Sequence, residues 1–264
     1  MSVLLQISDP HFGTEQPAVV EALVALARQL RPDLLVLSGD ITQRARPAQF
    51  DAARIFIGRL GAAVLAVPGN HDIPLFNLWA RLRHPYARHI AAFGPDLEPV
   101  HDSADMLVLC VNTTRAWRHK HGQVSARQID RVTRALAIAG PAQLRVVVVH
   151  QPAAVARAED APNLLRGHAA ALQSWAAAGA DVVMGGHIHL PYVLALPGLE
   201  RRMWAVQAGT AVSSRVRKDV PNSVNVLRWG ANEASGCCVV EQWDFSAAKQ
   251  AFVRARLTTL TACR

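Results

Sequence analysis

The chain has few cysteines and no long apolar segment. Its four cysteines, Cys110, Cys237, Cys238 and Cys263, show no CxxC spacing, which argues against a zinc knuckle or a thioredoxin-like redox pair. No uncharged apolar stretch reaches the roughly 18 residues that a membrane-spanning helix needs. The segment from Met1 to Ile7 is too short for a secretion signal and lacks its basic start. We therefore expect a cytoplasmic protein without a membrane span, with Cys110 as a small buried hydrophobe in an apolar strand.

Acidic residues are outnumbered by basic ones. The chain has 28 Lys and Arg against 20 Asp and Glu, a formal net charge of +8. Such an excess favours anionic partners, whether nucleotides, phospholipid head groups or nucleic acid. The basic residues are almost all Arg and are scattered, without the long run typical of a nucleic-acid-binding segment. A small phosphate ester is thus favoured over nucleic acid, and the oligomeric state is left open.

Repeats, low-complexity segments and linkers are also missing, so one domain over residues 1–264 is the simplest organisation. Short apolar runs predict central strands of a covered sheet: Val3–Ile7, Leu34–Leu37, Val64–Val67, Met106–Val111, Val146–Val149 and Val182–Met184. Helical periodicity separates them over Pro17–Leu30, Pro47–Leu60, a segment from Ser125 with a Ser125/Gln128 capping box, and Ala169–Ala178.

After residue 190 the pattern changes and predicts strands without helices between them. They are Tyr192–Leu196, Met203–Gln207, Ser223–Leu227, Cys237–Phe245 and Phe252–Leu257. Alternating β and α followed by strands predicts an α/β fold, a two-sheet αββα sandwich. Residues 1–190 then hold the site motifs, and residues 191–264 complete the second sheet.

Polar clusters follow the strands of the first part. They are Ser8-Asp9-Pro10-His11, Ser38-Gly39-Asp40, Gly69-Asn70-His71-Asp72, His150, and Gly185-Gly186-His187-Ile188-His189. The carboxyl ends of parallel strands lie along one edge of a sheet, so these side chains are expected to meet there. Residues two apart on an extended segment point the same way, so Asp9/His11 and His187/His189 each offer two ligands. Imidazole and carboxylate together indicate Zn, Mn or Fe.

These five blocks, in this order, resemble the signature of the calcineurin-like metallophosphoesterases. The match runs from Asp9 to His189 with every block intact. Within that family the chain looks most similar to class III cyclic-nucleotide phosphodiesterases and glycerophosphodiesterases, whose Gln-Ala-Gly-Thr segment is echoed at Gln207–Thr210. The resemblance to the lipid A pathway pyrophosphatases is poorer, because those carry Arg where this chain has His71.

The resemblance implies two divalent transition-metal ions, Mn, Fe or Zn. One is held by Asp9, His11, Asp40 and His189, and the other by Asp40, Asn70, His150 and His187, with Asp40 bridging. A pair of ions about 3.5–4 Å apart clamps both sides of an in-line displacement and activates a hydroxide for attack on phosphorus. The family assigns His71 as the general acid at the leaving-group oxygen. Asp72 is expected to orient an imidazole.

Four functions follow from these residues. A phosphodiesterase leads, with a cyclic nucleotide or glycerophosphodiester as substrate, ahead of a nucleotide or lipid-linked pyrophosphatase and a nuclease. A non-enzymatic scaffold is disfavoured because no ligand is missing. Arg44 and His168 are candidate substrate contacts. The remaining histidines are expected at the surface or hydrogen-bonded: His84, His89, His101, His119 and His121. Segment 115–121 is either a basic lid with an aromatic for a base or, as favoured here, a solvated loop pinned by Trp117.

Overall fold

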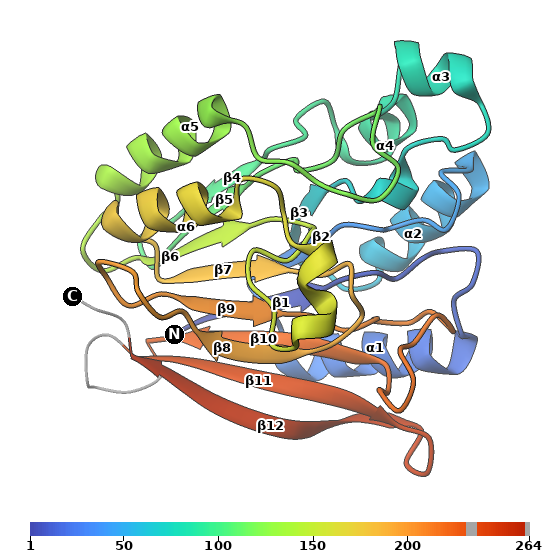
Figure 1. Cartoon of the computed structure of the whole chain (residues 1–264). Coiled ribbons are helices and arrows are strands. Elements are labelled where there is room, and N and C mark those ends of the chain that lie inside the picture. The colour runs from blue at the N-terminus through green and yellow to red at the C-terminus, as the bar shows by residue number, and fades with distance from the viewer. Residues whose placement is uncertain (231–236, 262–264) are drawn as a thin grey trace.

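Two six-stranded sheets face each other, and helices cover their outer sides (Figure 1). The computed structural model describes residues 1–230 and 237–261; Cys263 lies outside these residues. The predicted two-sheet αββα sandwich is confirmed. Of the described helices, none is long and apolar enough to cross a membrane.

The first sheet contains the strands that carry the first three motifs. In spatial order its strands are β12 (Ala251–Thr261), β11 (Cys237–Ser246), β10 (Ser223–Trp229), β1 (Ser2–Ile7), β2 (Leu34–Ser38) and β3 (Ala63–Val67). Strands β1, β2 and β3 run parallel, whereas β10 pairs antiparallel with β1 in the register Leu4↔Leu227. The carboxyl ends of β1, β2 and β3 therefore lie at one edge.

The second sheet carries the last two motifs. Its strands are, in spatial order, β4 (Val100–Asp102), β5 (Met106–Cys110), β6 (Leu144–Val148), β7 (Val182–Gly185), β9 (Trp204–Gln207) and β8 (Tyr192–Ala195). Strands β5, β6, β7 and β9 are parallel. The strands after residue 190 are thus divided between the sheets. The prediction that all of them complete the second sheet was wrong, because β10, β11 and β12 extend the first.

The described helices are α1 (Pro17–Leu30), α2 (Pro47–Gly58), α3 (Leu78–Arg83), α4 (Ala87–Phe93), α5 (Ala126–Ala137) and α6 (His168–Ala177), with short 3₁₀ turns η1 (Asn70–Asp72) and η2 (Ala158–Asn163). The four predicted helices, now α1, α2, α5 and α6, lie close to their predicted positions. The capping box at Ser125 is confirmed: its Oγ accepts from the Gln128 N–H, and its own N–H donates to Gln128 Oε1. Helices α3 and α4 and strand β4 were missed.

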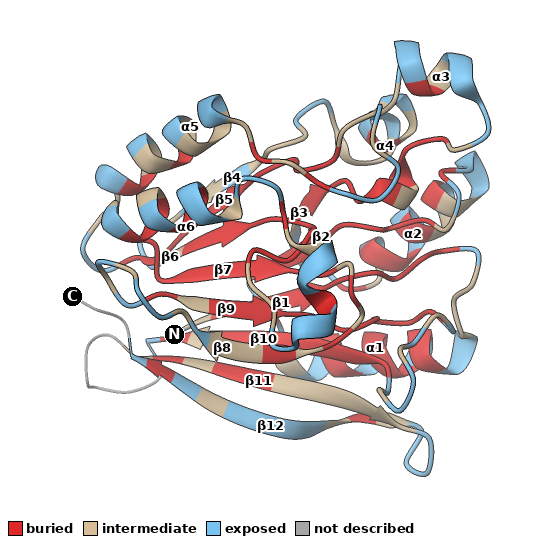
Figure 2. Cartoon of the chain, viewed as in Figure 1, coloured by how far each residue is buried: buried red, intermediate tan, exposed pale blue. Residues whose placement is uncertain are grey.

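Three apolar layers hold the sandwich together, and each follows from alternation along the strands. In β1, Leu5 and Ile7 pack towards α1 and α2, while Leu4 faces the other sheet. In β6, Val146 and Val148 fill the space between the sheets. The neighbouring Val147 packs under α5 and α6 instead. Figure 2 shows the central strands of both sheets buried along most of their length, whereas β11 and β12 at the edge of the first sheet are largely intermediate or exposed. Cys110 is fully buried in the layer between the sheets, as predicted.

Candidate metal centre

Strand ends of both sheets supply the predicted ligands. Asp9 and His11 follow β1, Asp40 follows β2, and Asn70 begins η1 after β3. From the second sheet, His150 follows β6, and His187 and His189 follow β7. The prediction that all of these side chains meet at the edge of one sheet was wrong. The centre instead lies where the carboxyl ends of the parallel strands of two sheets meet.

A first group of ligand atoms gathers around Asp9, His11 and His189, which all lie within 4.8 Å of one another. His189 Nε2 is 3.3 Å from Asp9 Oδ1 and 3.2 Å from His11 Nε2. The Nδ1 of His189 donates to the backbone carbonyl of Arg215. That bond leaves Nε2 free to bind a metal, the arrangement expected around a metal-binding histidine.

A second group comprises Asp40, His150 and His187, again within 4.8 Å. His150 Nδ1 lies 2.8 Å from the Ser38 carbonyl, which it donates to, so its Nε2 faces the centre. That Nε2, the Oδ1 of Asn70 and both ring nitrogens of His187 are buried and have no hydrogen-bond partner among the described residues. Buried polar atoms are almost always satisfied. Unpartnered nitrogen and oxygen atoms of this type, gathered around one carboxylate, are suitable ligands for a transition-metal ion.

Asp40 lies between the two groups. Its Oδ2 lies 3.9 Å from His11 Nε2, and its Oδ1 lies 3.3 Å from His150 Nε2. A third overlapping group, His11, Asp40 and His71, lies within the same 4.8 Å limit. One carboxylate facing two neighbouring sets of imidazoles has the geometry of a bridging ligand.

Charge in this region also favours cations. Burial lowers the pKa of His11 to about 3 and that of His187 to about 3, so both are neutral near pH 7, the form that binds metal. Burial opposes ionisation of Asp9, yet His189 and His150 bring its pKa down to about 2. Burial also opposes the charged form of His150, but Asp40 raises its pKa to about 9. The buried carboxylates thus stay charged and attract positive charge.

The ligand backbone is not extended, contrary to the prediction. Asp9, His11 and Asp40 have φ of 50°, 43° and 48°, and His187 and His189 have φ of 73° and 56°. A non-glycine residue rarely adopts this left-handed region, and such strain gathers at functional sites. Asp9 and His11 still reach one group, but His187 and His189 serve different groups.

Two glycines make room for the ligands. Gly39 has φ +94°, and a methyl group added there would collide with the His150 ring. At Gly69 an added methyl would collide with the backbone nitrogen and the carboxylate of Asp40. Glycine at these two positions therefore permits the close approach of two ligand loops.

His71 and Asp72 have different surroundings although they are neighbours. His71 Nδ1 lies 2.9 Å from the Gln43 carbonyl, and the His71 N–H donates to Asp40 Oδ1. The Asp72 carboxylate accepts from the backbone N–H groups of Ile41, Thr42 and Gly69. Burial and then Asp40 raise the pKa of Asp72 to about 6. The expectation that Asp72 orients an imidazole was wrong: in the described structure it ties the β2 and β3 loops together.

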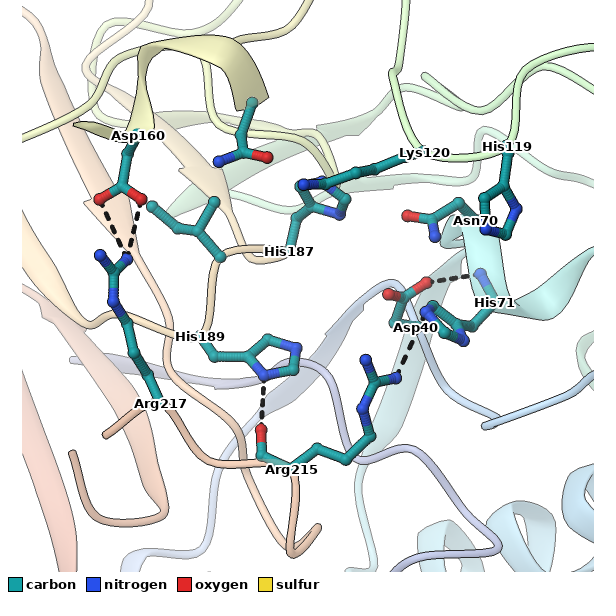
Figure 3. A pocket seen from close by; sticks show the side chains of 12 residues that line it. Asp40, Asn70, His71, His119, Lys120, Asp160, His187, His189, Arg215 and Arg217 are labelled. Carbon is teal, nitrogen blue, oxygen red and sulfur yellow. Dashed lines mark hydrogen bonds and ion pairs between the residues drawn. The ribbon is translucent and has the colours of Figure 1, made fainter. Parts of the chain in front are cut away.

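A pocket of about 440 Å³ opens over the ligands (Figure 3). Besides ligands and His71, its lining includes side chains that were not predicted as site residues: His119, Lys120, Asp160, Asn163, Arg215 and Arg217. Arg217 is paired with Asp160 and Glu159. Arg215 Nη1 lies 3.3 Å from a ring nitrogen of both His11 and His71, and it donates to Gln43 Oε1.

The two predicted substrate contacts do not line this pocket. Arg44 is exposed and stacks on the Phe76 ring, and His168 donates from Nδ1 to the Leu165 carbonyl at the start of α6. Segment 115–121 has a mixed outcome. Trp117 is 72% exposed, so its ring does not anchor the loop in the core. His119 and Lys120 of the same loop line the pocket. A faint signal for Arg215 and Arg217 existed in the polar stretch 213–219 between two predicted strands.

A family model for the calcineurin-like phosphoesterases matches residues 2–191, which include all five motif blocks. The chain belongs to this family. This calcineurin-like phosphoesterase is 28% identical over 205 residues to a cAMP/cGMP dual specificity phosphodiesterase of Mycobacterium tuberculosis. The matched region covers 71% of this chain and 61% of that protein. It is 24% identical over 259 residues to a probable cyclic nucleotide phosphodiesterase of Rhodococcus erythropolis, covering 91% and 80%.

A shorter match links this phosphoesterase to a probable cyclic nucleotide phosphodiesterase of Synechococcus, 34% identical over 80 residues, or 27% of this chain and 31% of that one. The chain thus spans less than two thirds of the mycobacterial and Synechococcus relatives. Among solved structures, a Danio rerio dimetal phosphatase superposes with a TM-score of 0.69 at 14% identity, covering 99% of each chain. A yellow lupin purple acid phosphatase gives 0.70 at 12% identity, covering 98% of this chain and 53% of that one. At such identities the likeness concerns the fold.

Proposed function

We propose that this calcineurin-like phosphoesterase is a dinuclear-metal-dependent phosphodiesterase. The observation that carries the proposal is a single carboxylate, Asp40, facing two sets of buried imidazoles at the base of an open pocket. The ligand set is complete, which argues against a scaffold that has lost turnover. Each set combines imidazole with oxygen ligands, the chemistry that Mn, Fe and Zn accept.

In this proposal one set of residues binds the metal ions and another set contacts the substrate. Asp9, His11, Asp40 and His189 would hold one ion, and Asp40, Asn70, His150 and His187 the other. Bound ions would supply Lewis acidity towards the phosphoryl oxygens and lower the pKa of a water molecule. The sandwich keeps the ligands rigid, since their strands are buried on both faces.

His71 is the proton donor in this proposal. Its Nδ1 donates to the Gln43 carbonyl, so its Nε2 is the nitrogen that faces the pocket. In the proposal Arg215 Nη1, now 3.3 Å from that Nε2, turns to a phosphate oxygen, and a protonated Nε2 can then pass its proton to a leaving alkoxide. The hydrogen bond from Nδ1 to a backbone carbonyl fixes the orientation of the ring. Asp72 was predicted to have this role.

Arg215 is the anion-binding group. No described carboxylate pairs with its guanidinium, which lies between His11 and His71 and is fixed by Gln43 Oε1. Arg217, by contrast, has its charge balanced by Asp160 and Glu159. A guanidinium with free N–H groups suits a non-bridging phosphate oxygen. Figure 3 shows Arg215 pointing towards Asp40 and His71 from the opposite wall to η2.

A diester is favoured over other phosphate esters because the relatives that match the chain are named as phosphodiesterases. Cyclic AMP is the first natural diester to test. The second candidate is a pyrophosphatase, which Lys120 favours as a further cation of the pocket lining that pairs with no described carboxylate, since a pyrophosphate brings more negative charge.

The test is a panel of substrates with Mn-loaded protein. Bis-p-nitrophenyl phosphate, p-nitrophenyl phosphate, cyclic AMP and a nucleoside diphosphate ester are compared at neutral pH. We expect faster turnover of the diester than of the matching monoester. A clear preference for the monoester or for the pyrophosphate bond contradicts the proposal, and degradation of single-stranded DNA would indicate a nuclease.

A further inference from the structure

Helix α3 buries a charged side chain and exposes its large apolar ones, the reverse of an ordinary surface helix. Its arginine Arg81 is only 8% exposed, while Leu78, Trp79 and Leu82 are 66%, 67% and 72% exposed. A helix on the surface of a domain normally turns its apolar side inward and its charges outward. Figure 2 shows most of α3 in pale blue, the colour of exposed residues. No other described helix exposes more than one large apolar side chain.

The inversion is built into the fold and is not a consequence of fraying. The Arg81 guanidinium donates to the Pro74 carbonyl and to the Arg118 carbonyl, so it ties α3 to the loop of residues 115–121. Asn77 caps the helix by accepting from the Ala80 N–H. These bonds hold the side of α3 that carries Leu78, Trp79 and Leu82 away from the core.

Two further exposed aromatics extend this surface. Phe76, which precedes α3, is 80% exposed, and Trp117 of the neighbouring loop is 72% exposed. Trp117 and Leu82 line the same hollow, so the helix and the loop form one surface. We call the exposed side chains Phe76, Leu78, Trp79, Leu82 and Trp117 the α3 face. Large apolar groups gathered in this way mark a surface that something else covers.

The charge around the α3 face is mainly positive, although Asp96 and Glu98 line the hollow that Leu82 and Trp117 share. The sequence contains no Asp or Glu between Asp72 and Asp96, nor in residues 106–129. Exposed cations lie nearby. Arg44 stacks on Phe76, Arg83 ends α3, and Lys120 lies in the same loop as Trp117. The covering partner must therefore be anionic where it meets this rim and apolar where it meets the aromatic residues.

We propose that the α3 face docks on an anionic lipid bilayer surface. Aromatic and leucine side chains enter the boundary between head groups and acyl chains, and the arginine and lysine rim meets the negative lipid head groups. A second copy of the chain is a poorer partner, because a two-fold contact would set the same cationic rim against itself. A nucleic acid would use the cations and stack on the aromatics, but would leave Leu78 and Leu82 uncovered.

This docking places the pocket at the lipid surface. The loop that carries Trp117 also sends His119 and Lys120 into the pocket lining, and Arg81 joins that loop to α3. A bilayer touching the α3 face would therefore lie beside the pocket mouth. The inference concerns binding, so it does not depend on the proposed phosphodiesterase activity.

The test is co-sedimentation of the purified full chain with vesicles of phosphatidylcholine, with and without about one third phosphatidylglycerol. We expect binding to the anionic vesicles only, weakened by added salt because charge contributes to it. The double variant Trp79→Ser/Leu82→Ser and the single variant Arg83→Glu should each lower the partition coefficient by about tenfold or more. The mutated side chains are exposed, so turnover of a small diester should stay unchanged and report correct folding.

The matched control lies on α5 and its C-cap, where Ile138 is 88% exposed and Arg134 is also exposed. Ile138→Ser/Arg134→Glu should leave vesicle binding unchanged. Failure of the wild-type chain to sediment, or equal loss in the control, overturns the proposal. So does a dimer that the α3 variants dissociate in light scattering, which would assign the face to a second copy. Binding of single-stranded DNA in place of vesicles overturns it as well.

Discussion

Asp40 and His150 form a buried pair, with Oδ1 of the carboxylate 3.3 Å from Nε2 of the ring. The same carboxylate lies 3.9 Å from His11 Nε2 in the other ligand group. In the proposed ligand sets Asp40 is the one shared residue, and His150 belongs to only one set. Replacing each of them should therefore have a different effect on metal content.

Asp40→Ala is expected to lose both ions, whereas His150→Ala should keep the ion of the Asp9, His11 and His189 group. The loss of affinity should exceed about 100-fold, since removing even a supporting group around a metal ligand costs that much. Elemental analysis after Mn loading measures the ratio of ions to chain. One ion retained by Asp40→Ala would show that the carboxylate does not bridge.

The ligand residues could be predicted from the sequence because each block is a short run directly after an apolar strand. Asp9, His11, Asp40 and His150 needed no long-range information, since parallel strands bring their ends together. The strand β10 could be predicted as a strand, but its partner could not. Its apolar alternation fits either sheet, and only packing decides that it pairs with β1.

Other features could not be predicted because no local pattern marks them. Arg215 reaches the pocket from the connection between β9 and β10, and only tertiary packing sets it beside His71. Asp72 follows a ligand, yet its hydrogen bonds go to backbone groups. Helix α3 has six residues and no inward apolar stripe, because its apolar side faces out, so a search for periodicity misses it.

The unpaired cation Arg215 and the paired cation Arg217 give a matched comparison. Arg215→Gln is expected to lower kcat/KM for a diester by about 10–100-fold, the usual effect of losing a hydrogen bond to a charged group. Arg217→Gln should have a smaller effect because Asp160 and Glu159 already balance its charge. In both variants the Arg215 carbonyl still holds His189. Steady-state kinetics with metal content as a check would contradict the assignment if Arg217→Gln proved more harmful.

Gly69 and Gly58 test the close approach of the ligand loops. Gly69→Ala would push a methyl group into Asp40, whereas nothing lies within 4 Å of a methyl group added to Gly58. We expect Gly69→Ala to lower the free energy of unfolding by about 1–3 kcal/mol and to weaken metal binding. Gly58→Ala, at the end of α2, should leave it unchanged or raise it by up to about 1 kcal/mol. Urea unfolding and elemental analysis measure both effects, and equal behaviour of the two variants would refute the steric argument.

His89 predicts an acid-sensitive contribution to stability away from the centre. Its ring is buried between Phe50 and Phe93, and burial lowers its pKa from 6.5 to about 4. The unfolded chain therefore binds a proton more readily than the folded one. The free energy of unfolding is fully retained above pH 6.5 and falls as the pH drops towards 4, by a few kcal/mol on the order-of-magnitude scale of linkage.

His89→Phe removes this titration while keeping a ring of similar size. The difference in unfolding free energy between wild type and variant should therefore shrink or reverse as the pH falls from 7 to about 5. Urea unfolding at both pH values measures it, and His121→Gln at an exposed position is the control. A difference that does not change with pH would show that His89 does not titrate in this range.

His71 offers the sharpest test of the proposed chemistry, because its predicted role is separable from metal binding. Its Nδ1 is held by the Gln43 carbonyl and its Nε2 faces the pocket, so His71→Ala should keep both ions and the fold. We expect turnover of a diester with an alkoxide leaving group to fall by about 10²–10⁴-fold, the usual contribution of a general acid. A p-nitrophenolate leaves without a proton, so the activated diester should suffer much less.

His150→Ala is the comparison, since losing a ligand should slow both substrates alike. The measurements are metal content and the ratio of the rates on the two diesters for each variant. Loss of an ion from His71→Ala would make His71 a ligand, as its place in the group with His11 and Asp40 allows. Equal slowing of both substrates with the ions retained would leave His71 a role in binding, and the proton would then have to come from another group.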